Sequence, residues 1–283
     1  MSNIITAHNL NKSFGSFQAL KNVDLAIQKG QIVGIIGANG AGKTTLLNSI
    51  LGLSTYDGAL DVLGFNPYDE RDELMKQICF ISDVATLPKW IKVSEAIDFV
   101  EGVHASFDRE KALEFLAGTS VPLDKKIRHL SKGMTVQVHL ALIMAIDAKI
   151  LVLDEPTLGL DILYRKKFYN QLLEDFFDED RTILITTHQV DEIENILSRV
   201  VFIREGRIIL DADMDDIGSQ WMVLNTSPEN RDAARERGPI SEQTHLGRTS
   251  FVFKDQSREA LQKIGDVSRL NLSDLFVTLM EGE

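Results

Sequence analysis

Short, almost continuously apolar runs recur along the chain, and each ends at a polar or glycine-rich segment. They cover residues 32–36, 78–82, 150–153 and 182–187. Runs of this kind predict strands that are buried on both faces of a parallel sheet. The stretches between them are long enough for helices, so the pattern predicts an α/β fold.

Two segments predict antiparallel pairing instead. Residues 4–36 hold short apolar stretches punctuated by glycine, which favour a small antiparallel sheet near the N-terminus. Residues 200–204 and 207–210 flank Glu205-Gly206 and predict a hairpin.

From about residue 84 to 146 the pattern becomes helical. Ser94 is a candidate N-cap for a helix that reaches His104, and Asp108 is one for residues 109–117. Ser131 precedes a run, 136–146, that is apolar almost all round and therefore predicts a buried helix. A further helix is expected from Val190 to Leu197.

Beyond about Asp215 the pattern changes to short mixed segments. Strands are expected at 221–224, 249–253 and 267–270, and helices near 230–237, 257–264 and 273–280. We therefore expect a main domain over 1–215, with a helical subdomain at about 84–146, and a small α+β extension over 216–283. The extension carries no chemical motif and could add to a dimer interface or serve regulation.

Composition narrows the class of protein. The 283 residues are 44% apolar and 25% charged, which is ordinary for a soluble globular chain, and Cys79 is the single cysteine. There is no apolar run of about 18 residues and no signal-peptide pattern, so we expect a cytosolic protein. A net charge of −12 argues against broad nucleic-acid binding.

The first chemical motif follows the run at 32–36. It reads Gly37-Ala38-Asn39-Gly40-Ala41-Gly42-Lys43-Thr44-Thr45 and precedes a helical run. Glycines there let backbone N–H groups and the helix N-terminus hold phosphate oxygens. In such a loop Lys43 reaches the β- and γ-phosphates and Thr44 ligates Mg²⁺. A plain glycine turn is the alternative, and the strand and helix flanks argue against it.

Two more strand ends carry polar groups. Asp154 and Glu155 follow one buried run; in phosphate-loop enzymes, an Asp there holds Mg²⁺ and a Glu activates water. His188 ends the next run, at the expected position of the γ-phosphate. Phe14 precedes the loop and could stack on adenine, although taken alone it favours a core position.

Together these motifs resemble those of the ATP-binding subunit of an ATP-binding cassette (ABC) transporter, over about residues 3–215. Residues 37–45 look like Walker A, 150–155 like Walker B, and Leu130-Ser131-Lys132-Gly133-Met134 like the family signature. Residues 157–161 resemble the D-loop, His188 the switch histidine and Phe14 the adenine-stacking aromatic. The overall pattern is most similar to bacterial export-type cassettes.

The chain departs from that family at three places. Lys132 and Met134 replace a Gly and a Gln of the usual signature, and the family's usual Gln and basic residue are missing just after it. Asp83 stands where the family has Gln or Glu. Its shorter carboxylate still suits Mg²⁺ or its water.

The resemblance implies a head-to-tail pair of subunits that holds ATP and Mg²⁺ between Walker A of one and the signature of the other. The implied catalytic residues are Lys43, Glu155 and His188; the implied metal ligands are Thr44, Asp83 and Asp154. The residues implied to bind the nucleotide are Phe14, Asn39, Gly40, Ala41, Gly42, Lys43, Thr44, Thr45, Ser131, Gly133 and Asp161.

The implied partners are integral membrane permease subunits and a second cassette, identical or not, at the cytoplasmic face of the membrane. One alternative is a soluble cassette ATPase that acts on ribosomes or DNA. A GTPase is another, although Asn11-Lys12-Ser13-Phe14 lacks the Asp of the guanine-reading motif. A third, a catalytically dead interaction protein, is disfavoured by the presence of Lys43, Asp154, Glu155 and His188.

Overall fold

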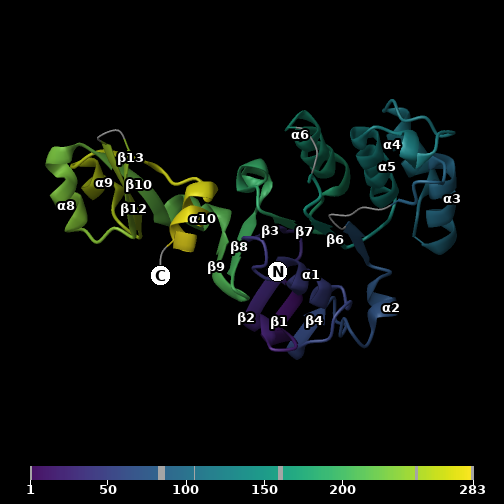
Figure 1. Cartoon of the computed structure of the whole chain (residues 1–283), viewed down its shortest axis with the longest axis horizontal. Helices are drawn as coiled ribbons and strands as arrows, with labels where there is room; N and C mark the ends of the chain where they lie inside the picture. The colour runs from purple at the N-terminus through teal and green to yellow at the C-terminus, as the bar shows by residue number, and fades with distance from the viewer. Residues whose placement is uncertain (1, 82–86, 105, 159–161, 246–247, 282–283) are drawn as a thin grey trace.

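The computed structural model describes residues 2–81, 87–104, 106–158, 162–245 and 248–281 (Figure 1). In this part of the chain the largest sheet has the strand order β5-β6-β7-β3-β8-β9. Its strands are β5 (Ile78–Ile81), β6 (Ile150–Asp154), β7 (Thr182–Thr187), β3 (Ile32–Ile36), β8 (Arg199–Arg204) and β9 (Arg207–Asp213). Neighbours are parallel except β8 and β9, which form the predicted hairpin. The α/β class expected from the sequence is confirmed.

The N-terminal strands form a separate antiparallel sheet, as the sequence predicts. Its order is β2-β1-β4, and its strands are β1 (Asn3–Phe14), β2 (Phe17–Gln28) and β4 (Asp57–Val62). Helix α1 (Lys43–Ile50) shares a buried apolar cluster with this sheet and with β3. The short helix α2 (Arg71–Leu74) precedes β5. The loop between β3 and α1 is therefore held between two sheets.

The helical subdomain holds α3 (Val93–Val103), α4 (Arg109–Ala117), the 3₁₀ turn η1 (Ile127–His129) and α5 (Lys132–Met144). Asp108 caps α4 by accepting a hydrogen bond from the Lys111 backbone N–H, as predicted. The prediction that Ser94 caps α3 is wrong. The helix begins at Val93, and the Glu95 carboxylate accepts from the Lys92 backbone N–H at 2.8 Å, so the cap is Lys92, two residues earlier.

A second correction concerns the segment after β7. It forms two 3₁₀ turns, η3 (Val190–Glu192) and η4 (Glu194–Ile196), rather than the helix expected over Val190–Leu197. In a 3₁₀ turn, side chains at positions i and i+3 eclipse one another. This spacing lets Val190 and Ile193 enter the same apolar cluster before the chain turns into β8.

After β6 the chain forms α6 (Ile162–Gln171) and a π-helical turn, η2 (Leu172–Phe176). After β9, α7 (Met214–Gln220) leads to a four-stranded antiparallel sheet of order β11-β12-β10-β13, which lies at one end of the molecule (Figure 1). The strands of this sheet and the helices that connect them are β10 (Trp221–Thr226), η5 (Pro228–Asn230), α8 (Arg231–Arg235), β11 (Ser241–His245), β12 (Arg248–Lys254), α9 (Arg258–Gln262) and β13 (Asp266–Arg269). Strand β11 was not predicted, because Ser-Glu-Gln-Thr-His has no apolar alternation and the strand lies at the sheet edge.

The last helix, α10 (Leu272–Glu281), returns from this sheet to the main sheet. The ring of Phe276 packs edge-on against Phe202 of β8, with centroids 5.3 Å apart. One Nη atom of Arg204 donates to the Leu279 carbonyl at 3.0 Å. The C-terminal segment is therefore anchored next to the strand that neighbours β3.

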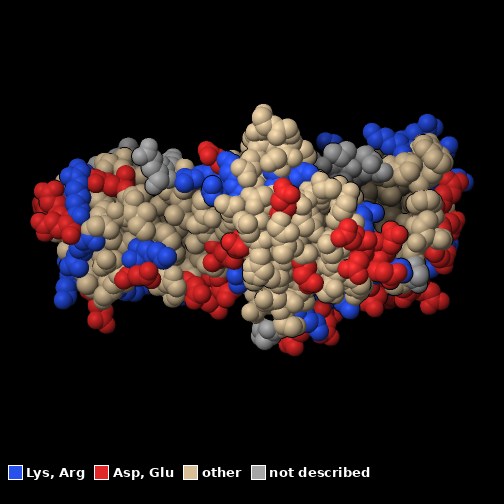
Figure 2. Space-filling model, turned by 90° about the horizontal axis from the view of Figure 1, so that it is seen from below, with Lys and Arg blue, Asp and Glu red and all other residues tan. Residues whose placement is uncertain are grey.

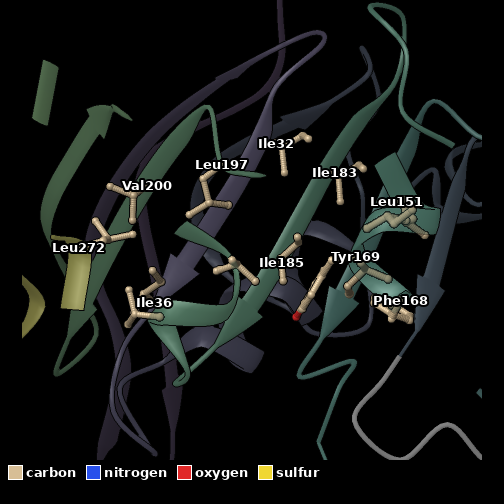
Figure 3. Close-up of a cluster of buried hydrophobic side chains, with 14 of the residues drawn as sticks. Ile32, Ile36, Leu151, Phe168, Tyr169, Ile183, Ile185, Leu197, Val200 and Leu272 are labelled. Carbon is tan, nitrogen blue, oxygen red and sulfur yellow. The ribbon is translucent and has the colours of Figure 1, made fainter. Parts of the chain in front are cut away.

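Side chains of the main sheet alternate between two buried clusters. Ile32 and Ile36 of β3 lie in one, with residues of α6 and α10, whereas Val33 and Ile35 lie in the other, with α1 and the antiparallel sheet. Figure 3 shows the first cluster, in which Tyr169 and Phe168 from α6 lie beside the strands. Because both faces are covered, only the ends of the strands are available to carry functional groups.

Charged residues of both signs are mixed over the face shown in Figure 2, and no continuous basic stripe runs across it. Among the described residues, no helix is both long and apolar enough to cross a bilayer.

Candidate functional site

The glycine-rich loop joins β3 to the start of α1. Gly40 and Gly42 have φ angles of 80° and 114°, in the region that favours glycine. A side chain on Gly37 would also meet the Ile203 carbonyl oxygen, 2.5 Å from its Cβ. Gly42 caps α1 without a side-chain hydrogen bond, so the helix N-terminus opens directly onto the loop.

Lys43 lies inside this loop, and its side chain is only 7% exposed. Its Nζ donates to the Gly37 carbonyl at 2.7 Å and to the Ala38 carbonyl at 3.3 Å, and it lies 3.8 Å from Glu155 Oε1. Burial lowers the pKa of Lys43, and the nearby carboxylates of Glu155 and Asp154 oppose that shift. The ammonium is thus held at the centre of the loop by uncharged carbonyl partners, which an anionic phosphate can replace.

A hydroxyl and a carboxylate meet at the end of β6. Thr44 Oγ1 donates to Asp154 Oδ2 at 3.0 Å, and Thr186 Oγ1 of the neighbouring strand β7 donates to Asp154 Oδ1. Asp154 is only 4% exposed, and its carboxylate is oriented by these two threonines. Hydroxyl and carboxylate oxygens are the donors that Mg²⁺ prefers, so the Thr44 and Asp154 pair fits that ion.

Glu155 follows Asp154 in the left-handed region, with a φ angle of 50°. Its backbone N–H donates to Thr186, at 3.1 Å to the carbonyl and 3.2 Å to the hydroxyl. Nδ1 of His188, at the end of β7, lies 3.0 Å from both Glu155 carboxylate oxygens. This strained backbone turns the carboxylate toward the loop, where it lies between Lys43 and His188.

Lys43, Thr44, Glu155 and His188 line one open cavity of about 600 Å³ above the loop. This volume falls within the range of roughly 300–1,000 Å³ that small-molecule sites occupy. Its lining consists of Phe14, Phe17, Ala19, Asn39, Gly40, Ala41, Gly42, Lys43, Thr44, Thr45, Glu155, Leu158 and His188. The structure therefore brings together segments that lie far apart in the sequence, next to the N-terminus of α1.

Two aromatic rings stand at the rim of this cavity. Phe14 and Phe17 end β1 and begin β2, and they are 56% and 61% exposed. The core position that Phe14 favours on its own is therefore wrong; the turn between the strands projects the ring outward. Lys12 Nζ lies 5.0 Å from the centroid of the Phe14 ring. The sequence analysis missed Phe17, although both rings flank the Gly15-Ser16 turn.

The signature segment lies outside the cavity lining. Ser131 caps α5, and its Oγ accepts from the Met134 backbone N–H at 3.2 Å. Ser131 and Lys132 are exposed, whereas Gly133 is buried. Within one chain, then, Ser131 and Gly133 are not brought to the loop that holds Lys43.

Two further predicted site residues, Asp83 and Asp161, lie outside the described residues. A residue that the sequence analysis missed, Thr186, bonds both Asp154 and the Glu155 backbone. The sequence signal for Thr186 was its position near the end of an apolar run, two residues before His188. Its partner is set by the pairing of β6 with β7, in which Asp154 lies opposite Thr186.

Similarity to known proteins agrees with this geometry. Residues 20–158 match a family described as "ABC transporter". The tungstate uptake system ATP-binding protein TupC of Peptoclostridium acidaminophilum is 33% identical over 210 residues, covering 72% of this chain and 96% of that protein. ABC transporter ATP-binding protein YtrB of Bacillus subtilis is 26% identical over 289 residues, covering 99% of both. Nod factor export ATP-binding protein I of Cupriavidus metallidurans is 28% identical over 305 residues, covering 99% of this chain and 98% of that protein.

The fold also matches solved structures. One, described as the ATP-binding subunit of an ABC transporter, superposes with a TM-score of 0.68 at 24% identity. It covers 76% of this chain and 92% of that one.

Proposed function

The chain belongs to the ABC transporter family as an ATP-binding protein, and we propose that two such cassettes close head to tail around ATP and hydrolyse it to drive transport. One observation carries this proposal. Lys43, Glu155 and His188 line a single open cavity, whereas Ser131 and Gly133 of the same chain are absent from its lining. A second cassette supplies the Ser131 and Gly133 that the lining lacks.

The loop and the first turn of α1 bind the triphosphate. Lys43 exchanges the carbonyls of Gly37 and Ala38 for the β- and γ-phosphate oxygens, which are stronger acceptors for a buried ammonium. Backbone N–H groups of Gly40 through Thr45 surround the phosphates. The rings of Phe14 and Phe17 at the cavity rim offer a stacking surface for adenine.

Mg²⁺ is held by Thr44 and by Asp154, directly or through water. When bound, it neutralises charge on the phosphates and helps to orient them for attack. Thr186 keeps Asp154 aimed at this position through its hydroxyl. On the basis of sequence, Asp83 adds an oxygen ligand, and Asp161 contacts the nucleotide across the interface.

Glu155 is the general base that takes a proton from the attacking water. His188 lies 3.0 Å from its carboxylate and holds that group in place while its ring faces the γ-phosphate position. Lys43, in the same cavity, stabilises the charge that builds up on the transferred phosphoryl group. Ser131 and Gly133 of the second cassette close on that group, and the exposed Lys132 adds a positive charge beside it.

The membrane partner docks beside the helical subdomain. A cavity of about 830 Å³ lies among α2, β5, α3 and α5, and its lining includes Ile81 and Leu87, which flank in sequence the undescribed residues around Asp83. Phe99 and Val103 of α3 are also exposed, at 66% and 65%. This apolar surface supports the docking of an integral membrane permease, and we propose that such a partner holds the chain peripherally on the cytoplasmic face of the membrane.

We assign residues 1–215 to the nucleotide-binding domain, with its helical subdomain at about 84–146, and residues 216–283 to a C-terminal extension. Export is the proposed direction, because the export protein from Cupriavidus metallidurans matches this chain along almost its whole length. Uptake is the alternative, since TupC is named for tungstate uptake.

Mixing two inactive variants tests the composite site. Lys43→Ala disables the loop, and Ser131→Arg disables the signature, so each variant alone is inactive. A mixed pair contains one intact site, made from the loop of one subunit and the signature of the other. An equal mixture should recover about a quarter of wild-type hydrolysis if pairing is random, because half of the pairs then carry one intact site of two. Failure of the mixture to recover activity would contradict the proposal.

A further inference from the structure

A second open hollow lies beside the nucleotide cavity, between the start of α6 and α10. We refer to it as the α6–α10 groove; its volume is about 1,000 Å³. Ile162 and Leu163 form one side of it, Phe276 and Val277 the other, and the segment from His188 to Val190 lies between them. It is thus built jointly by the main domain and the C-terminal extension.

The rim of the groove is apolar and unusually exposed. Ile162 is 80% exposed, Leu163 is 75% exposed and Val277 is 39% exposed. Single exposed apolar side chains are ordinary, but several around one hollow mark a site of contact with another molecule.

Hydrogen bonds connect both walls of the groove to the turn η3. Arg165 of α6 donates a hydrogen bond to Glu192 of η3, and the Ser273 hydroxyl of α10 donates to Asp191 of the same turn. The Leu272 backbone N–H also donates to the next turn, at 3.0 Å to Glu194 Oε1. The groove is therefore preformed, and little conformational entropy is lost when a partner fills it.

His188 lines both the α6–α10 groove and the nucleotide cavity. A molecule that closes over the nucleotide cavity therefore reaches the edge of the groove as well. In the head-to-tail pair that molecule is the second cassette. The groove is continuous with the face on which the pair forms.

We propose that the α6–α10 groove is a docking surface for a second copy of this chain, and that it receives the partner's Ile162 and Leu163. The inference rests on the proposed head-to-tail pair. In a two-fold dimer each copy presents the same surface, so a projecting apolar pair beside an apolar hollow is self-complementary. Helix α10 then belongs to the dimer interface, and the extension takes part directly in ATP-driven association.

Crosslinking tests which residues meet. In a Glu155→Gln, Cys79→Ala background, one copy carries Leu163→Cys and a second, differently tagged copy carries Val277→Cys. Because neither chain holds both cysteines, a bismaleimide can join Leu163→Cys to Val277→Cys only between copies. We expect this mixed product with ATP and not without it. Chains that form ATP-dependent dimers but give no mixed product would overturn the docking surface and leave the proposed function intact.

Association provides the second measurement. Val277→Asp places a charge in the groove, and Ile240→Asp is the matched control, since Ile240 is also in the extension and 45% exposed. In the Glu155→Gln background, Val277→Asp should weaken ATP-dependent dimerisation by about tenfold or more, which corresponds to about 1.4 kcal/mol, and leave binding of a fluorescent ATP analogue to the monomer unchanged.

Equal dimerisation of the two variants would contradict the inference, as would crosslinking to a permease or insertion into vesicles in place of the second copy. If the Glu155→Gln parent forms no dimer with ATP, the inference and the proposed function both fail.

Discussion

His188 Nδ1 lies 3.0 Å from both carboxylate oxygens of Glu155. The two residues directly follow the neighbouring parallel strands β7 and β6, and Thr186 accepts a hydrogen bond from the Glu155 backbone N–H. The histidine therefore fixes the position of the carboxylate before a water molecule arrives, and its ring remains 40% exposed on the cavity side.

Replacing this histidine should slow hydrolysis without preventing binding. His188→Ala frees the Glu155 carboxylate and removes the proposed contact to the γ-phosphate, so kcat should fall by about 100-fold. ATP affinity should change little, because Lys43 and the loop are untouched. Steady-state hydrolysis and equilibrium binding of a fluorescent ATP analogue measure the two effects, with the exposed His8→Ala as control. A parallel loss of binding would show that His188 has a different role.

Lys43→Ala should act mainly on binding. The variant removes the buried ammonium that is proposed to bind the β- and γ-phosphates, and hydrogen bonds to charged groups contribute about 1.5–3 kcal/mol. ATP affinity should fall by about 10- to 100-fold. Isothermal titration calorimetry with ATP and Mg²⁺ measures the dissociation constant. Lys29 is a partly exposed lysine paired with Asp180, so the control Lys29→Ala should bind ATP normally. Unchanged affinity in Lys43→Ala would remove this lysine from the binding site.

Thr186→Val tests the support of the metal site. The variant leaves one oxygen of the buried Asp154 carboxylate without its threonine partner, which should lower the free energy of unfolding by about 1–3 kcal/mol. Hydrolysis should also require more Mg²⁺. Thr182→Val is the matched control: Thr182 begins the same strand, and its Oγ1 accepts from the Gly30 backbone N–H at 3.0 Å. Identical Mg²⁺ dependence in both variants would mean that Thr186 does not orient the metal ligand.

Cys79 should make the protein less stable at alkaline pH. Burial raises the pKa of its thiol to about 12 in the folded chain. Between the ordinary value near 8.5–9 and about 12, the unfolded chain loses this proton while the folded chain keeps it. The free energy of unfolding therefore falls as pH rises through this range, by up to about 1.4 kcal/mol per pH unit.

Urea unfolding at several pH values above about 8 measures this slope. In Cys79→Ala the free energy of unfolding should fall less steeply with pH than in the parent. Any loss of stability from the smaller side chain does not affect this test, because only the slopes against pH are compared. Equal slopes would contradict the assignment of this dependence to the thiol.

Much of the fold was predictable because its signals are local. Asp108 caps its own helix, and the apolar runs that became β3, β6 and β7 are each short and almost continuous. The order of Lys43, Asp154, Glu155 and His188 also implied a shared site, since parallel strands end at the same edge of a sheet. Their proposed roles remain predictions.

Other features depend on contacts that a single sequence does not display. The pairing of Thr186 with Asp154 follows from which strands are neighbours, and the spacing along the chain does not reveal it. Phe14 is apolar, which by itself favours a buried position, but the β1–β2 turn projects its ring outward. The polar strand β11 is recruited by pairing with β12, which overrides its weak local pattern.

The most direct test of the account is the association of Glu155→Gln followed by sedimentation velocity. This variant keeps the loop, the metal ligands and the signature, but its side chain is no longer a general base, so ATP binds and is not turned over. With ATP and Mg²⁺ it should pass from monomer to dimer, and the additional change Ser131→Arg should return it to monomer while ATP still binds. A Glu155→Gln protein that stays monomeric with saturating ATP, or that hydrolyses ATP at close to the wild-type rate, would contradict the composite ATP site.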